Sequence, residues 1–157
     1  MEQILANIRN DKRVIVGATL SELNSGNINE IYKIVKEANV KGLGFSFFTP
    51  QINESSISNT LLDDMIRDIK VLKASDPEFI LVSDKMLETI KYKRHIKNCV
   101  LRKGFVVSYA PNLSRKVPCI LGEGIDCSNC GCVIPVSAHC LKIIDIETLK
   151  MLRKVFS

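Results

Sequence analysis

Five of the six cysteines lie within 22 residues, and three of them fall in the stretch IDCSNCGCVI at positions 125–134. The full pattern is Cys119-x7-Cys127-x2-Cys130-x-Cys132-x7-Cys140. Spacings this short let backbone turns aim several sulfurs at one centre, as in metal and iron–sulfur sites. A disulfide between Cys130 and Cys132 would be strained, because only Gly131 separates them. In a reducing compartment the pattern therefore favours metal ligation or redox chemistry.

The composition fits one soluble globular domain of 157 residues with 46% hydrophobic and 25% charged residues. No apolar run approaches the roughly 18 residues that cross a membrane, and the amino terminus lacks the pattern of a signal peptide. We therefore expect a cytoplasmic protein without membrane association. The net charge of +5 is modest, and the basic run at residues 91–97 reads as a solvated helix face rather than a nucleic-acid site.

Apolar patterning predicts alternating strands and helices through residue 98. After a short helix over residues 1–10, the run VIVGATL at 14–20 is typical of a strand buried on both faces. Apolar residues on one helical face at 28–38 and a second apolar run at 43–48 complete a right-handed βαβ unit. Further expected elements are a helix over 61–72, a short strand at 79–82 and a helix over 84–97.

Two regions follow from this pattern, with a boundary near residue 98. Residues 1–98 form the α/β unit, with a mainly parallel sheet that amounts to a partial (β/α) barrel. Residues 99–157 form a loop-rich, cysteine-rich module that closes with a helix over 146–156. Three parallel strands cannot close a barrel, which needs about eight. We therefore expect the exposed sheet edges to be covered by the last module or by another chain.

The cysteine pattern supplies four ligands with one to spare. We predict that Cys119, Cys127, Cys130 and Cys132 bind the metal, with Cys140 as the substitute. Cys99, twenty residues upstream, is expected to be an ordinary thiol. Spacing alone leaves zinc and a [4Fe–4S] cluster equally open, since His139 beside Cys140 could complete a zinc site.

Residues 14–24, 28–35 and 42–50 resemble the late βα units of radical SAM enzymes, and residues 79–87 resemble the segment that leaves their barrel. The cysteine-rich region is similar to the SPASM and Twitch extensions of that superfamily. This resemblance implies that the extension holds an auxiliary [4Fe–4S] cluster. It also implies an iron–sulfur-binding, radical-SAM-like protein; the alternative from the residues themselves is a zinc-stabilised α/β module that docks a partner protein.

One feature departs from the superfamily, because the chain has no Cys-x3-Cys-x2-Cys motif to hold a catalytic cluster. The resemblance therefore extends only to the C-terminal half of such an enzyme. It implies that S-adenosylmethionine (SAM) binds only if an N-terminal half completes the barrel, and that this chain alone does not cleave SAM. The expected partner is an N-terminal half-barrel chain or a second copy of the protein.

Other polar residues carry weaker signals. In a complete relative, the side chains near the carboxyl ends of the strands would face a ligand; here these are Thr19, Glu22, Asn24 and Ser46, although capping and turn formation explain them equally well. Asp63 and Asp64 are adjacent, so a helix points them about 100° apart and makes them a poor acid–base pair. We expect both to be solvated.

Overall fold

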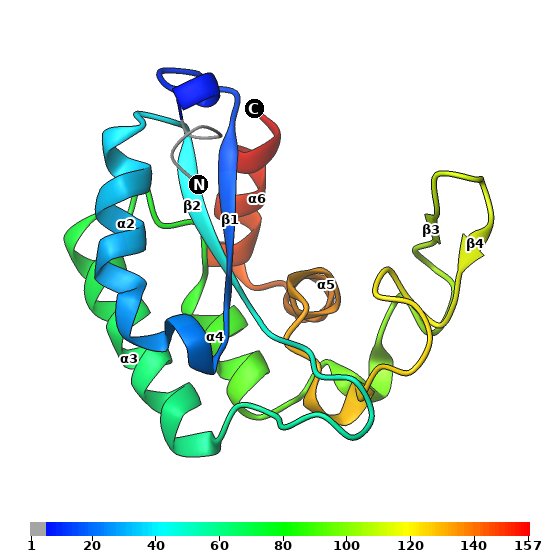
Figure 1. The fold of residues 1–157 in the computed structure, drawn as a ribbon. Helices are drawn as coiled ribbons and strands as arrows, with labels where there is room; N and C mark the ends of the chain where they lie inside the picture. Colours follow the sequence, from blue (N-terminus) through cyan, green and yellow to red (C-terminus); the bar gives the residue numbers. More distant parts are fainter. Residues whose placement is uncertain (1–5) are drawn as a thin grey trace.

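A pair of parallel strands forms the centre of the computed structural model, which describes residues 6–157 (Figure 1). Strand β1 (Ile15–Leu20) pairs with β2 (Gly42–Phe47) in a register that runs from Ile15↔Gly42 to Leu20↔Phe47. The connection contains a 3-10 turn, η1 (Glu22–Asn27), and helix α2 (Ile28–Glu37). The predicted βαβ unit is thus present. The helix expected over residues 1–10 lies partly outside the described residues.

The third predicted strand is reduced to one bridge. Ile80 pairs with Leu43 in a parallel bridge, held by the Leu43 N–H to Phe79 O bond (2.9 Å) and the Leu81 N–H to Leu43 O bond (2.8 Å). The segment therefore lies beside β2 in the expected parallel direction.

The two faces of the sheet differ in side-chain size. One face packs into the hydrophobic core with α2 and with α3 (Asn59–Ser75), and it carries Val16, Ala18, Leu20, Leu43, Phe45 and Phe47. The other face carries smaller residues, Gly17, Thr19, Gly44 and Ser46 among them. Figure 1 shows α2 and α3 on one side of the strands and α6 on the other. The expectation that the strand at 14–20 is buried on both faces was wrong, because Gly17 and Thr19 on its small-residue face are exposed.

The last two helices pack on the α/β unit. Helix α4 (Asp84–Lys91) contacts both α5 (Val133–Lys142) and α6 (Ile146–Phe156), and the buried hydroxyls of Ser83 and Thr148 lie 2.7 Å apart. Helix α5 was not expected, because Pro135 reads as a helix breaker. Here Pro135 occupies the first turn, where a missing N–H costs no helical hydrogen bond.

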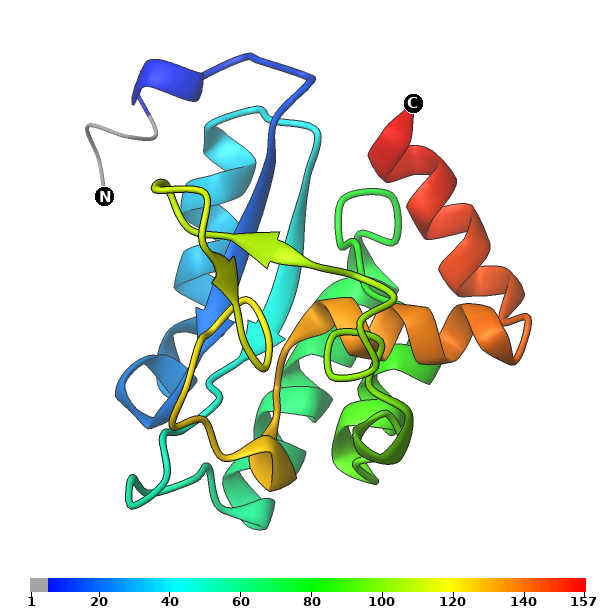
Figure 2. The same cartoon turned by 90° about the vertical axis from the view of Figure 1, so that its right-hand side faces the viewer.

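Residues 99–132 stand apart as an arm with little regular structure. A hairpin whose strands have two residues each, β3 (Ser108–Tyr109) and β4 (Arg115–Lys116), forms its tip. The hairpin projects from the helical body (Figure 1) and lies in front of β1 and β2 when the molecule is turned (Figure 2). In this stretch the buried hydrophobic residues are Cys99 and Leu101, so the arm has almost no core of its own.

These elements confirm a mixed α/β fold with a small parallel sheet. No barrel is formed by residues 6–157, whose strands make two separate two-stranded sheets. Among the helices described, none is both long and apolar enough to cross a membrane.

The close approach of the third segment makes Gly42 sensitive to substitution. A Cβ at Gly42 would lie 2.6 Å from Leu81 Cδ1 and 2.9 Å from Phe79 O, whereas one at Gly17 would meet nothing within 4 Å. We expect Gly42→Ala to lower the free energy of unfolding by about 1–3 kcal/mol. Gly17→Ala, the matched control on the neighbouring strand, should leave it unchanged or raise it slightly. Urea unfolding measures both, and equal values would contradict this packing.

Candidate metal site

A small cavity of about 20 Å³ brings five thiols together. The cysteines that line it are Cys99, Cys119, Cys127, Cys130 and Cys132. Four of these are the predicted ligands, which the fold gathers around one space from two turns of the arm. The fifth, Cys99, was expected to be an ordinary thiol, because it belongs to no cysteine motif. Its place beside the others arises only from folding.

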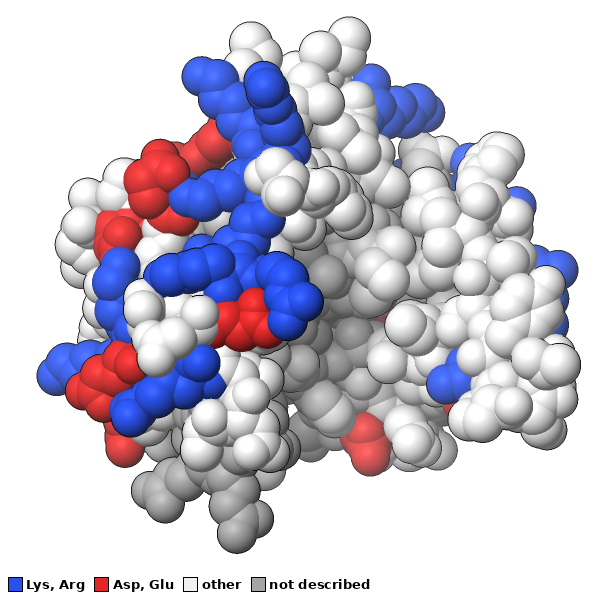
Figure 3. All heavy atoms as spheres, turned by 90° about the horizontal axis from the view of Figure 1, so that it is seen from above, with Lys and Arg blue, Asp and Glu red and all other residues white. Residues whose placement is uncertain are grey.

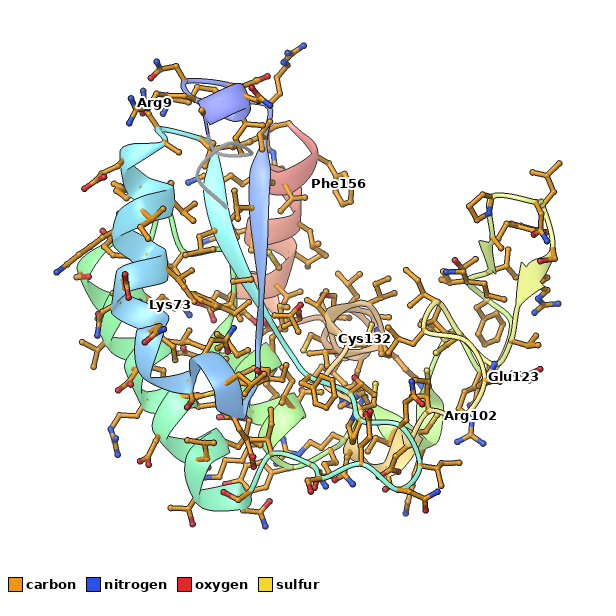
Figure 4. The ribbon with its side chains drawn as sticks, viewed as in Figure 1. Arg9, Lys73, Arg102, Glu123, Cys132 and Phe156 are labelled. Atoms are coloured by element: carbon orange, nitrogen blue, oxygen red, sulfur yellow. The ribbon has the colours of Figure 1, made fainter. Side chains whose placement is uncertain are left out.

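The rest of the cavity wall is mainly apolar. Its remaining members are His95, Ile96, Leu101, Arg102, Leu121, Ile125 and Pro135. No Asp or Glu is among the described residues that line it. Figure 4 shows Cys132 at the start of α5 and Arg102 on the neighbouring arm segment. A site of sulfur donors in apolar surroundings suits soft metals rather than Mg²⁺ or Ca²⁺, which take oxygen ligands.

A capped turn separates Cys127 from Cys130. The 3-10 turn η3 (Cys127–Asn129) begins after Asp126, whose carboxylate accepts hydrogen bonds from the Ser128 N–H (2.9 Å) and the Asn129 side-chain amide (2.6 Å). Asp and Asn favour such local side-chain bonds, which compete with longer helices. The two thiols of this Cys-x-x-Cys therefore project from either end of one tight, fixed turn.

The end of β2 clamps the next turn, Cys130-Gly131-Cys132. The Phe47 N–H donates to Gly131 O (3.0 Å), and the Gly131 N–H donates to Thr49 Oγ1 (2.9 Å). A Cβ at position 131 would lie 2.3 Å from Phe47 O, so this approach requires glycine. The carboxyl end of a parallel strand thereby fixes the positions of two thiols.

A second connection continues away from the sheet. The Asp126 N–H donates to Pro50 O (2.9 Å), and the Ile52 N–H donates to Gly124 O (2.7 Å). Residues 50–52 and 124–126 thus run antiparallel beside each other, around the bridge between Gln51 and Ile125. The cysteine turns are attached to the loop that follows β2.

His95 supports the same turn from the opposite side. Its side chain is buried, and its Nε2 lies 3.0 Å from the carbonyl oxygen of Cys130. Burial lowers the pKa of His95, so the ring is neutral at pH 7 and donates its Nε2–H to this carbonyl. Sequence reasoning missed both His95 and Thr49, because each is far from the cysteines in the chain.

Burial also controls the charge of the thiols. It raises the pKa of Cys130 from 9.0 to about 11, and it raises the pKa values of Cys127 and Cys132. The Arg102 guanidinium acts in the opposite direction on Cys127. These thiols are therefore protonated at pH 7 unless a cation stabilises the thiolates. Metal binding would release protons and strengthen as the pH rises.

The thiols share a cavity without already forming a coordination shell. Within residues 6–157, no three His, Cys, Asp or Glu side chains are gathered closely enough to hold a metal ion. A bound metal would require the arm thiols to move, inward around a single ion and outward around a larger cluster. The arm lacks a core to resist this movement, so ligation and ordering of the arm would be coupled.

Cys140 and His139 lie outside the cavity. Cys140 is fully buried in α5, where its sulfur lies 3.5 Å from Thr89 Oγ1 of α4. Burial raises the pKa of its thiol. His139 is on the same helix and does not line the cavity. The structure therefore does not bring the two residues into the thiol group that the sequence pattern suggested.

The polar residues near the strand ends have structural partners. The hydroxyls of Thr19 and Ser46 lie 3.0 Å apart on the small-residue face. Asn24 accepts from the Ser21 N–H (2.8 Å) and donates to Thr19 O (3.0 Å), so it caps the turn after β1. Glu22 begins η1 and is exposed.

The adjacent carboxylates form surface ion pairs. Asp63 pairs with Lys91 and Asp64 pairs with Arg67, each at 2.8 Å. The side chains are exposed to solvent, in agreement with the sequence expectation.

Compared with known proteins, the chain matches no protein-family model, no curated protein and no solved structure. The fold and the cavity together define a mixed α/β protein whose thiols gather at the carboxyl end of its parallel strands.

The raised pKa of Cys130 predicts its reactivity. Only the thiolate reacts with iodoacetamide, so alkylation of Cys130 in the folded, metal-free protein should increase with pH toward a midpoint of about 11. In urea the same residue should react with a midpoint near its ordinary 9.0. Peptide-resolved mass spectrometry measures both. Identical midpoints in the two states would show that burial does not protect this thiol.

Proposed function

We propose that this chain is an iron–sulfur-binding protein of radical-SAM-like architecture, whose arm holds a [4Fe–4S] cluster through Cys119, Cys127, Cys130 and Cys132. The observation that carries the proposal is the convergence of thiols from separate turns on one apolar cavity. Cysteine thiolates are the usual ligands of such clusters. The resemblance to auxiliary-cluster extensions supports the cluster over zinc; the spacing of the loop cysteines is compatible with both.

The local charges fit a thiolate-bound centre. Four thiolates around a metal leave an excess of negative charge, and Arg102 at the cavity wall is placed to offset part of it. Hydrogen bonds from Thr49 and from the Cys132 N–H favour the thiolate form of Cys130. Hydrogen bonds to cluster sulfurs also tune reduction potentials. When bound, a cluster of this kind supplies one-electron chemistry.

A metal would also account for the arm's stability. Hydrophobic burial contributes little there, because the exposed apolar side chains include Phe105, Tyr109 and Leu113 at 59–82% exposure. Small units without a core are commonly stabilised by disulfides or metals. The arm's cysteines are all free thiols, and a metal centre would link its turns.

Zinc is the second candidate, and the size of the cavity favours it. A space of about 20 Å³ accommodates roughly one water-sized sphere, which is enough for a single ion. A cubane cluster needs the arm to move outward. In that case the protein is a zinc-stabilised α/β module that docks a partner.

The α/β unit supports the architectural part of the proposal. Between the small-residue face of β1 and β2 and helices α5 and α6 lies an apolar groove of about 480 Å³, lined by Gly17, Gly44, Ile134, Leu152 and Phe156 among others. Figure 3 shows lysines and arginines interleaved with acidic residues over the helical side, while the hollow beside it is uncharged. An open inner face of this kind is expected of a partial barrel.

The proposed partner completes the sheet. On its outer edge β1 pairs with no strand in the described part of the chain, and an unpaired edge is a template for another strand. We propose that a half-barrel carrying the Cys-x3-Cys-x2-Cys motif, or a second copy, pairs there. SAM would bind only in such a completed barrel.

Anaerobic purification tests the metal. The protein should be brown, with about four irons per chain and matching inorganic sulfide. Cys127→Ser should reduce the iron content severalfold, whereas Cys140→Ser should retain it because Cys140 lies outside the cavity. A colourless protein with one zinc per chain would establish the second candidate instead. Absence of both metals after reconstitution would refute a metal site.

The open edge predicts self-association when the other half is absent. Sizing with light scattering should show a dimer or larger species. Gly17→Lys should shift this toward monomer, because a Cβ there meets no atom within 4 Å and a lysine on an edge strand opposes pairing. Gly26→Lys, at another open position, is the matched control and should not shift it. A wild-type protein that remains a sharp monomer at high concentration would contradict an unpaired edge.

A further inference from the structure

Five thiols line the cavity, but both a cubane cluster and a tetrahedral zinc ion take four. One of the five is therefore surplus. The spacing of the cysteines points to the four in the 119–132 loop, and the fold places Cys99 among them. The surroundings of each sulfur indicate which thiol is surplus.

Cys99 occupies the most fixed position of the five. It is 9% exposed, whereas the four loop cysteines are only partly buried. It directly follows the turn η2 (Ile96–Asn98), which continues from α4 through the buried His95. The next buried side chain is Leu101, at 5% exposure. Cys99 thus lies at the base of the arm, where the arm joins the helical body.

Cys99 also lies close to the other thiols. It lines the same cavity as Cys127, Cys130 and Cys132. The position of Cys99 in the cavity wall and its nearness to three candidate ligands are independent of the spacing motif.

We infer that Cys99 is a ligand of the metal centre, and that the surplus thiol belongs to the exposed 119–132 loop. The inference rests on the proposed function and revises its ligand set, because Cys99 takes the place of one of the four loop cysteines. A centre bound in this way joins the helical body to the arm, through a ligand contributed by the end of η2. It therefore ties the loop to the segment after α4, in addition to the bonds that already hold the Cys130-Gly131-Cys132 turn to β2 and His95.

Cysteine-to-serine variants test the assignment in the full chain. Cys99→Ser should lower the bound iron (or zinc) at least severalfold and change the visible or paramagnetic spectrum of any remaining centre. The matched control is Cys140→Ser, which removes a thiol that is equally buried but lies beside Thr89. It should retain the metal and the wild-type spectrum. Full metal content with an unchanged spectrum in Cys99→Ser would overturn the inference.

Alkylation of the wild-type protein separates a lost ligand from a folding defect. N-ethylmaleimide is applied to the metal-loaded protein and to the same protein after chelation, with peptide-resolved detection. Cys99 labelling should be at least tenfold slower with metal bound, whereas Cys140 labelling should change little. Equal protection of Cys99 in both states would refute its ligation. A wild-type chain that binds no metal would instead refute the proposed function, so the two failures are distinguishable.

Discussion

The close approach of Gly131 to the end of β2 connects the fold to the site. Only a residue without a Cβ allows the Phe47 N–H to reach Gly131 O, because a side chain would meet Phe47 O at 2.3 Å. This contact orients the Cys130-Gly131-Cys132 turn relative to the sheet. The strand is itself fixed by its buried face, so the core of the α/β unit determines where these thiols lie. Thr49 and His95 then hold the turn from two further directions.

Periodicity was sufficient to predict the α/β unit, since β1, α2, β2 and α3 each bury one continuous apolar face. It was less informative where local rules compete with packing. The segment at 79–82 is apolar enough for a strand, but only Ile80 finds a bridge partner. Pro135 led to the prediction of a loop where α5 lies, although the first turn of a helix tolerates proline. The cysteine-rich region was expected to be a module of its own that begins near residue 98. In the structure its last two helices, α5 and α6, pack against α4.

The candidate site was predictable only in part, for a similar reason. Spacing identifies cysteines that are near in the chain, and four of the thiols around the cavity were found in this way. Cys99, Thr49 and His95 come from separate segments, and their meeting depends on how the loop after β2 and the end of α4 face each other. Cys140 is the reverse case. It is close to the loop cysteines in the chain, but its position in α5 places its sulfur beside Thr89 and outside the cavity. Sequence distance therefore missed Cys99 as a neighbour and grouped Cys140 with thiols whose cavity it does not line.

The charge of the cavity thiols and the order of the arm are coupled. Burial keeps the cavity thiols protonated and therefore uncharged. The arm also has neither a core nor internal ion pairs to fix its turns around the cavity. A soft cation would displace the thiol protons and bind the resulting thiolates as shared ligands, and the free energy of ligation would contribute to ordering the arm. The same ligation would position the arm, whose hairpin faces the small-residue side of β1 and β2 (Figure 2). Ordering of the arm would leave the walls of the groove unchanged, because they come from β1, β2, Leu81 and helices α4, α5 and α6, and no residue of the described arm is among them.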